Sequence, residues 1–144
     1  MNLFGMLEIS GSAMGAERQR AEVVTSNMAN AQTTRSEAGG PYRRQLLVFR
    51  ARRMPGFPLL LAGRSQPSSP GVRVQQVVTD PSPPVRRYEP GHPDADTQGY
   101  VSYPAINPVE EMTDLLGAVR AYQLNASAVQ ASKNMIQQSL DIIR

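Results

Sequence analysis

The chain has 144 residues, of which 40% are hydrophobic, and a formal net charge of +3. This length allows one domain, or a small domain with an extended element. Cys and Trp are absent, which excludes disulfides, thiolate metal sites and Cys nucleophiles and predicts a modest core. The 12 Pro and 11 Gly lie mostly in the middle of the chain, so long regular elements are expected at its two ends.

The two parts of the chain differ in charge. Residues 1–79 contain ten Arg and four Glu, whereas residues 80–144 contain five basic and eight acidic residues. Opposite charges of this kind attract either within one molecule or between neighbours in an assembly, and the sequence leaves both open.

The sequence predicts neither a cleavable secretory signal nor insertion into a membrane. A signal peptide has a basic segment before its apolar run, but the first basic residue is Arg18, and Glu8 interrupts the apolar stretch. The densest apolar run, from Phe57 to Ala62, is far too short to span a bilayer. Export from the cytoplasm would need a route without a cleaved signal.

A first long helix is predicted at residues 3–31. Small residues in its first half lower the helix propensity but permit close approach of a second helix. Such a helix is marginal by itself, so we expect it to pack against another. It should end near residues 27–34, where Asn and Thr compete for backbone hydrogen bonds. Apolar residues at seven-residue intervals, with one intermediate, form its predicted assembly seam: Leu7, Met14, Ala21, Val24 and Met28.

The middle of the chain, residues 35–106, is predicted to be a small β-rich module. Apolar and β-branched residues indicate strands at 42–49 and 72–78. Between these strands, residues 54–71 are rich in Pro and Gly and favour a loop. Residues 82–87 are interpreted as leading to a proline-punctuated stretch at 88–93. A short extended segment at 100–104 then leads into the last helix.

A second long helix is predicted at 107–144, with Asn107 as its N-cap and Glu110 as its capping-box residue. About 36 helical residues span roughly 50 Å, too long for one small domain to cover. Alternating steps of three and four are typical of a coiled-coil seam. We expect Lys133, the one charged seam residue, to reach out to water or, preferably, to pair with an acid of another subunit. The seam consists of Met112, Leu115, Val119, Tyr122, Ala126, Val129, Lys133, Ile136, Leu140 and Ile143.

These elements predict an α+β fold. Its long terminal helices would pack as a coiled-coil-like stalk carrying the β-rich module and its proline- and glycine-rich loops. We expect residues 1–34 and 107–144 to form a terminal helical core, and 35–106 to form the module, with a variable loop near 50–71. An ordinary helical hairpin is the alternative, but the length and narrowness of the seam favour packing between molecules.

No residues point to catalysis. The single histidine, His92, lies close to Asp94 and Asp96, but a metal site needs further ligands that neither a second His nor a Cys supplies. A rigid turn with exposed acids is the favoured interpretation. Because no phosphate-binding glycine loop is present either, we expect no enzyme activity, cofactor, metal or small-molecule substrate.

Six arginines fall within 19 residues and form the most basic segment: Arg35, Arg43, Arg44, Arg50, Arg52 and Arg53. Such a segment can neutralise phosphates. No recognised nucleic-acid fold signature accompanies it, so a patch facing acidic neighbours or solvent is favoured. A nucleic-acid-binding module therefore stays as an alternative function, beside a coiled-coil adaptor that forms a closed oligomer.

Several short motifs stand out in the chain. One is an Asn-x-Ala-Asn-Ala element that includes Asn27, Ala29 and Asn30, and the more specific blocks include Pro90, Gly91, His92, Pro93, Asp94, Ala95, Asp96, Gly99, Tyr100, Glu110, Glu111 and Met112. In these motifs the chain resembles bacterial flagellar basal-body rod proteins, specifically the FlgC family of proximal rod proteins. The resemblance runs almost end to end, although Ala105 stands where the family usually has Asn and residues 50–70 match no family motif.

The resemblance implies a structural subunit of the rod, which transmits motor torque through the periplasm. It further implies partners among other copies of the chain, other rod and axial proteins, and the flagellar type III export apparatus. Subunits of such a rod would bury their apolar seams against neighbours through heterologous contacts that do not close.

Overall fold

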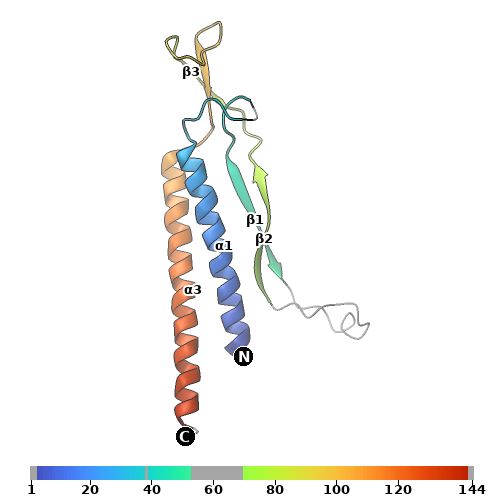
Figure 1. The fold of residues 1–144 in the computed structure, drawn as a ribbon, viewed down its shortest axis with the longest axis vertical. Coiled ribbons are helices and arrows are strands. Elements are labelled where there is room, and N and C mark those ends of the chain that lie inside the picture. The colour runs from blue at the N-terminus through green and yellow to red at the C-terminus, as the bar shows by residue number, and fades with distance from the viewer. Residues whose placement is uncertain (1–2, 38, 53–69, 143–144) are drawn as a thin grey trace, which may run out of the picture. The chain divides into compact units, whose positions relative to one another are not determined.

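The structure is a computed structural model that describes residues 3–37, 39–52 and 70–142. The fold is α+β, as predicted, with two long helices and two two-stranded sheets, in which β1 pairs with β2 and β3 pairs with β4 (Figure 1). Arg53, Ile143 and most of the predicted loop at 54–71 lie outside the described residues. The elements in chain order are α1 (Leu3–Ala29), β1 (Gln45–Arg52), β2 (Gly71–Thr79), β3 (Val85–Tyr88), β4 (Tyr100–Tyr103) and α3 (Pro108–Ile142).

Strand β1 begins three residues later than the predicted strand at 42–49, whereas β2 contains the whole of its predicted strand. The later start has a local cause, because the N–H of Tyr42 donates to the carbonyl of Thr33 at 3.0 Å. Tyr42 therefore belongs to the connection that follows α1, although its side chain is of the type that favours strands.

Strand β3 was not predicted. It pairs antiparallel with β4 in a register that runs from Val85 opposite Tyr103 to Tyr88 opposite Tyr100. The strand has only four residues and follows two prolines, so it offers no alternating pattern long enough to recognise. Its partner is the extended segment that was predicted at 100–104.

Helix α3 starts where predicted. The N–H of Val109 donates to Oδ1 of Asn107 at 3.1 Å, which is the bond expected of an N-cap. Glu110 accepts from the side-chain Nδ2 of Asn107 at 3.2 Å, a variant of the capping box, in which the acid would bind the backbone N–H. Helix α1 ends at Ala29, within the predicted region, and Asn30 Nδ2 then donates to the carbonyl of Ser26.

The chain divides into two compact units. The first comprises Met1–Gln19, Val48–Gln76 and Ala118–Arg144, and the second comprises Arg20–Leu47 and Val77–Gly117. Within the second unit α1 and α3 are antiparallel, because Arg20 contacts Asp114 whereas the later Asn27 contacts the earlier Glu111.

Apolar burial is sparse in the part of the chain that the structure describes. Its buried hydrophobic residues are all small, and its largest fully buried side chains include the polar Asn27 and Glu111. Polar contacts therefore provide much of the stabilisation that an apolar core provides in most domains. The buried hydrophobic residues are Ala16, Val24, Val101 and Ala118.

Candidate functional site: polar anchors and exposed helix faces

Asn27 belongs to the second unit and is only 2% exposed. Its Nδ2 donates to the carbonyl of Gln45 at 2.9 Å and to Oε2 of Glu111 at 3.1 Å. Its Oδ1 accepts from the N–H of Gln45 at 2.9 Å and from the hydroxyl of Tyr42 at 3.1 Å. An Asn side chain has two donors and two acceptor positions, so every hydrogen-bonding position of Asn27 is used.

Glu111, 1% exposed, carries the charge of this site. Its Oε1 accepts from Nε of Arg44 at 2.6 Å and lies 2.5 Å from Nη2 of the same guanidinium. A second ion pair joins Arg20 to Asp114 at 3.2 Å, and Asp114 also lies 3.9 Å from Arg44. A carboxylate is tolerated at such depth only when it is paired and hydrogen-bonded. We call Arg20, Asn27, Tyr42, Arg44, Gln45, Glu111 and Asp114 the polar cluster.

The polar cluster brings together two residues that the sequence singled out separately. Asn27 and Glu111 each belong to a family motif, and 84 positions separate them. Their contact was not predicted, and neither were the roles of Tyr42 and Arg44. A contact between single polar residues so far apart leaves no periodic signal in one sequence.

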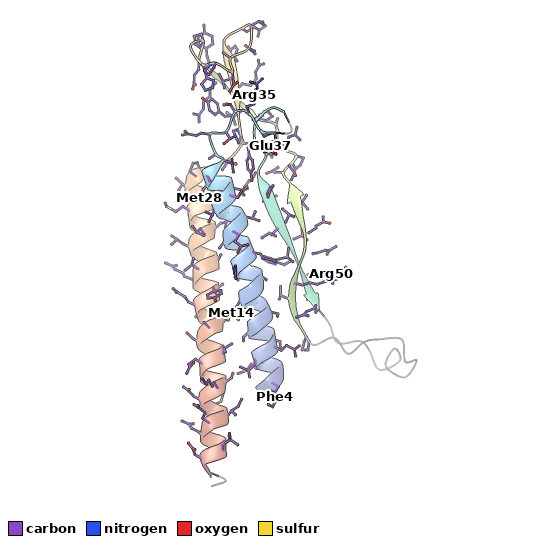
Figure 2. The ribbon with its side chains drawn as sticks, viewed as in Figure 1. Phe4, Met14, Met28, Arg35, Glu37 and Arg50 are labelled. Carbon is purple, nitrogen blue, oxygen red and sulfur yellow. The ribbon has the colours of Figure 1, made fainter. Side chains whose placement is uncertain are left out.

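The predicted basic segment is divided among different environments. Arg44 is bound to Glu111, and Arg35, whose side chain is 82% exposed, lies 3.8 Å from Asp94. Arg43 and Arg50 are exposed, and Figure 2 shows Arg50 on β1. The opposite charges of the two halves therefore meet, at least in these pairs, within one molecule.

The motif at residues 90–96 forms the connection between β3 and β4. Oδ1 of Asp96 accepts from the N–H groups of Gln98 and Tyr100, both at 2.9 Å, and Oδ2 accepts from Arg86. Gly99 has a φ of +80°, and a Cβ there would lie 2.9 Å from Cε2 of Tyr88. Asp96 and Gly99 are thus required by the shape of the turn.

His92 also has a structural role in this connection. Its Nδ1 accepts from the N–H of Asp94 at 3.1 Å, and its ring contacts that of Tyr103 edge-on. Asp94 Oδ2 accepts from the hydroxyl of Thr34 at 2.8 Å. Among the described residues no three His, Cys, Asp or Glu side chains are grouped as metal ligands. The contacts fit the predicted rigid turn.

Acid should loosen this turn by protonating Asp96. The N–H of Tyr100, aided by Gln98 and Arg86, holds the pKa of the Asp96 carboxyl below its usual range, against a smaller opposing effect of desolvation. Because this pKa is lowered in the folded state, the contribution to stability is complete above the unfolded pKa and is lost as the pH falls below about 4. The amide resonances of Gln98 and Tyr100, followed by NMR, should report the loss. An Asp96→Asn variant should lack this acid transition, and identical titrations would contradict the assignment.

In the first unit a second polar side chain joins α1 to a strand. Ser12 Oγ donates to the carbonyl of Ile9 at 2.8 Å and accepts from the N–H of Val72 at 3.0 Å. A Cβ on Gly71 would lie 2.4 Å from Ser12 Oγ and 3.1 Å from Ser12 Cβ. The start of β2 can therefore approach α1 this closely only because residue 71 has no side chain.

Gly71→Ala should lower the free energy of unfolding by about 1–3 kcal/mol, because the added methyl group displaces Ser12 from Val72. Adding Ser12→Ala should recover part of that loss, since it removes the atom that clashes most. Urea unfolding of the single and double variants measures both effects. Gly11→Ala, in α1, is the matched control, because its added Cβ would meet no other group within 4 Å. This substitution should leave the free energy of unfolding unchanged or raise it. Equal stability of Gly71→Ala and the parent would disprove the close contact.

The predicted C-terminal seam divides between two environments on α3. Its half-buried members are Leu115, Ala126, Val129 and Ile136, and its exposed members are Met112, Val119, Tyr122, Lys133 and Leu140. The most buried positions of α3 instead follow one another at seven-residue intervals: Glu111, Ala118, the half-buried Asn125, and Ser132. The face of α3 that packs within the molecule therefore consists of small or polar side chains, and much of the apolar seam stays exposed.

The N-terminal seam is more fully covered. Val24 is buried, and Leu7, Met14, Ala21 and Met28 are half-buried; Figure 2 labels Met14 and Met28 on α1. Neither of the two long helices, over the residues that the structure describes, contains a stretch that is long and apolar enough to cross a bilayer.

Two family models match parts of the chain, and curated relatives resemble it over nearly its whole length. The family model "Flagella basal body rod protein" matches residues 7–35, and the model "Flagellar basal body rod FlgEFG protein C-terminal" matches residues 97–142. The relatives are flagellar basal-body rod proteins FlgC. Those of Borreliella burgdorferi and Bacillus subtilis are each 36% identical, and that of Yersinia enterocolitica is 35% identical. The alignments cover 100%, 99% and 99% of this chain and 99%, 99% and 98% of the respective relatives. Asn27 lies in one matched segment and Glu111 in the other.

Proposed function

Because the chain belongs to the FlgC family of flagellar basal-body rod proteins, we propose that it is a non-enzymatic, structural subunit of the rod in the bacterial flagellar basal body. The observation that carries this proposal is the exposed apolar seam of α3, in a chain that resembles rod proteins over its whole length. A series of exposed apolar side chains along a helix is typical of a site of protein association.

The proposed mechanism is polymerisation through the terminal helices. Residues 1–34 and 107–144 form the axial core as a coiled-coil-like stalk, and residues 35–106 lie outside it as a separate module. Each subunit buries its seam against a neighbour through heterologous contacts, which propagate as a helical array instead of closing. Helices of this length overlap several neighbours and give a stiff shaft that transmits torque. Lys133 in the seam pairs with an acid of another subunit.

The proposed partners are other copies of the chain, other rod and axial proteins, and the flagellar type III export apparatus. The proposed location is the rod in the periplasmic space, reached without a cleaved signal peptide. Nucleic acid, membrane lipid and small molecules are not proposed as ligands. Arg44 supports this choice, since its guanidinium is bound to Glu111 and is not available to a phosphate.

Complementation of a strain that lacks its own FlgC-type rod protein tests this function. Swimming should return, and electron microscopy of isolated basal bodies with an antibody against the chain should locate it in the rod. A protein that stays in the cytoplasm with nucleic acid, or that forms only a small closed oligomer, would support one of the alternatives instead.

A further inference from the structure

We infer that Asn27 is the residue that specifies the register in which α1 pairs with α3. This inference deepens the proposed function. It rests on that function only for its consequence, which is that the register decides which face of α3 is left for neighbouring subunits. The segments concerned, Arg20–Ala29 and Pro108–Gly117, belong to one compact unit.

Fully buried apolar side chains are too few and too small to fix this register by themselves. The buried hydrophobic residues of α1 and α3 are Val24 and two alanines among the described positions, and small apolar side chains tolerate sliding by one helical turn. Hydrogen bonds are directional, so a buried polar pair satisfies its groups in one alignment only. A single buried Asn sets the alignment of coiled coils in this way.

A slip by one turn would be costly at Glu111. Moving α3 one turn toward the start of α1 would place Val23 or Val24 opposite its carboxylate in place of Asn27. Glu111 is fully buried, so it would lose a donor that no water replaces. The same slip would separate Arg20 from Asp114, which lie 3.2 Å apart in the observed register.

Asn27 also links the helix pair to the sheet. Its amide binds both the N–H and the carbonyl of Gln45, as a neighbouring strand would, at the first residue of β1. Tyr42 donates to the same side chain and so orients it from the connection that follows α1. One side chain therefore holds three segments of the chain, and a change of register would disturb all three.

The register decides what α3 presents to other molecules. With Glu111 turned toward Asn27, three apolar residues remain exposed on another side of the helix, roughly a third of a turn away: Val109, Met112 and Leu116, at 71%, 55% and 53%. Asn27 thus acts on assembly indirectly, as a positioning residue, without having to contact a neighbour.

The test uses Asn27→Asp, which keeps the shape of the side chain and removes both donors. Because the chain has no Cys, spin labels can be attached at Thr25→Cys and Thr113→Cys, two exposed positions on α1 and α3. In the purified full-length chain the parent should give one distance between the labels. Asn27→Asp should add a second population at a different distance, because the slip moves the label on α3 by about 5 Å along the helix axis relative to the label on α1, and it should speed amide exchange at Gln45 about tenfold or more.

Three further variants complete the test. Asn30→Asp is the matched control, because Asn30 bonds only to nearby positions, Ser26 and Thr33, and it should keep the single distance. Combining Asn27→Asp with Glu111→Gln restores a donor opposite an acceptor and should recover much of the parental distance. Tyr42→Phe removes one bond to Asn27 and should broaden the distance distribution slightly.

A single parental distance and parental Gln45 exchange in Asn27→Asp would overturn the inference. If Asn27→Asp does not fold, a double variant with Glu111→Gln that is no better folded would overturn it as well, whereas recovery would support it. These measurements need no rod. Failure of the parent chain to enter a rod would therefore count against the proposed function alone.

Discussion

Glu111→Ala should cost the isolated chain about 3–5 kcal/mol of unfolding free energy, the expected effect of removing one partner of a buried ion pair. Arg44, whose side chain is 23% exposed, would keep its charge without the carboxylate that now lies 2.5 Å away. Asn27 would lose the acceptor of one of its two donated bonds. Urea unfolding followed by circular dichroism measures the loss, which is large against the total stability of a small domain.

Glu110→Ala is the control for this experiment. Glu110 is the preceding residue, but it is exposed and contacts the side chain of Asn107, so its removal should cost less than about 1 kcal/mol. Arg44→Lys should also be destabilising, because an ammonium group lacks the planar fork through which Arg44 approaches Glu111 with two nitrogens. Equal losses of unfolding free energy for Glu110→Ala and Glu111→Ala would show that Glu111 in the polar cluster stabilises the fold no more than an exposed carboxylate does.

Val119→Asp should abolish incorporation into the rod and leave the subunit folded. Val119 is an exposed member of the seam, so the substitution costs little in the isolated chain. Once a neighbour covers the seam, the carboxylate would be desolvated without a partner, which opposes association strongly at every subunit. Swimming in soft agar and electron microscopy of basal bodies measure incorporation, and circular dichroism checks the fold.

The choice of position matters for this experiment. Leu115→Asp and Val129→Asp place a charge in the same predicted seam and should also abolish incorporation, but both residues are half-buried, so the subunit itself would be destabilised. Gln123→Asp adds the same charge at an exposed polar position of α3 and should leave swimming intact. Motile cells with normal basal bodies carrying Val119→Asp would argue against the seam as an assembly surface.

Local signals in the sequence predicted the long elements well. The spacing of apolar residues indicated both helices, and Asn107 as N-cap gave the start of α3 correctly. These features depend on neighbours within a few residues, so one sequence contains them in full. Strand β3 was missed because its four residues acquire strand geometry through pairing with β4, not through their own pattern.

The polar cluster lay beyond the reach of the same reasoning. Asn27 and Glu111 were marked by motif, and Arg44 was grouped with basic residues that were expected to face solvent or acidic neighbours. That these three side chains meet is a property of the tertiary fold. The periodicity of α3 likewise located its apolar residues, but it could not show that the intramolecular contact would use the small and polar positions one residue earlier.

The scarcity of buried hydrocarbon has a thermal consequence. The heat-capacity change of unfolding grows with the apolar area that becomes exposed. A subunit held by polar contacts should therefore have a small heat-capacity change, and its free energy of unfolding should vary little with temperature. The apolar side chains along α3 enter a dry environment only on association, and association should therefore show a large negative heat-capacity change. Calorimetry should then find that the free energy of association depends steeply on temperature, whereas the unfolding free energy of the subunit does not. Cooling should therefore weaken the contacts between molecules before it weakens the contacts within one molecule.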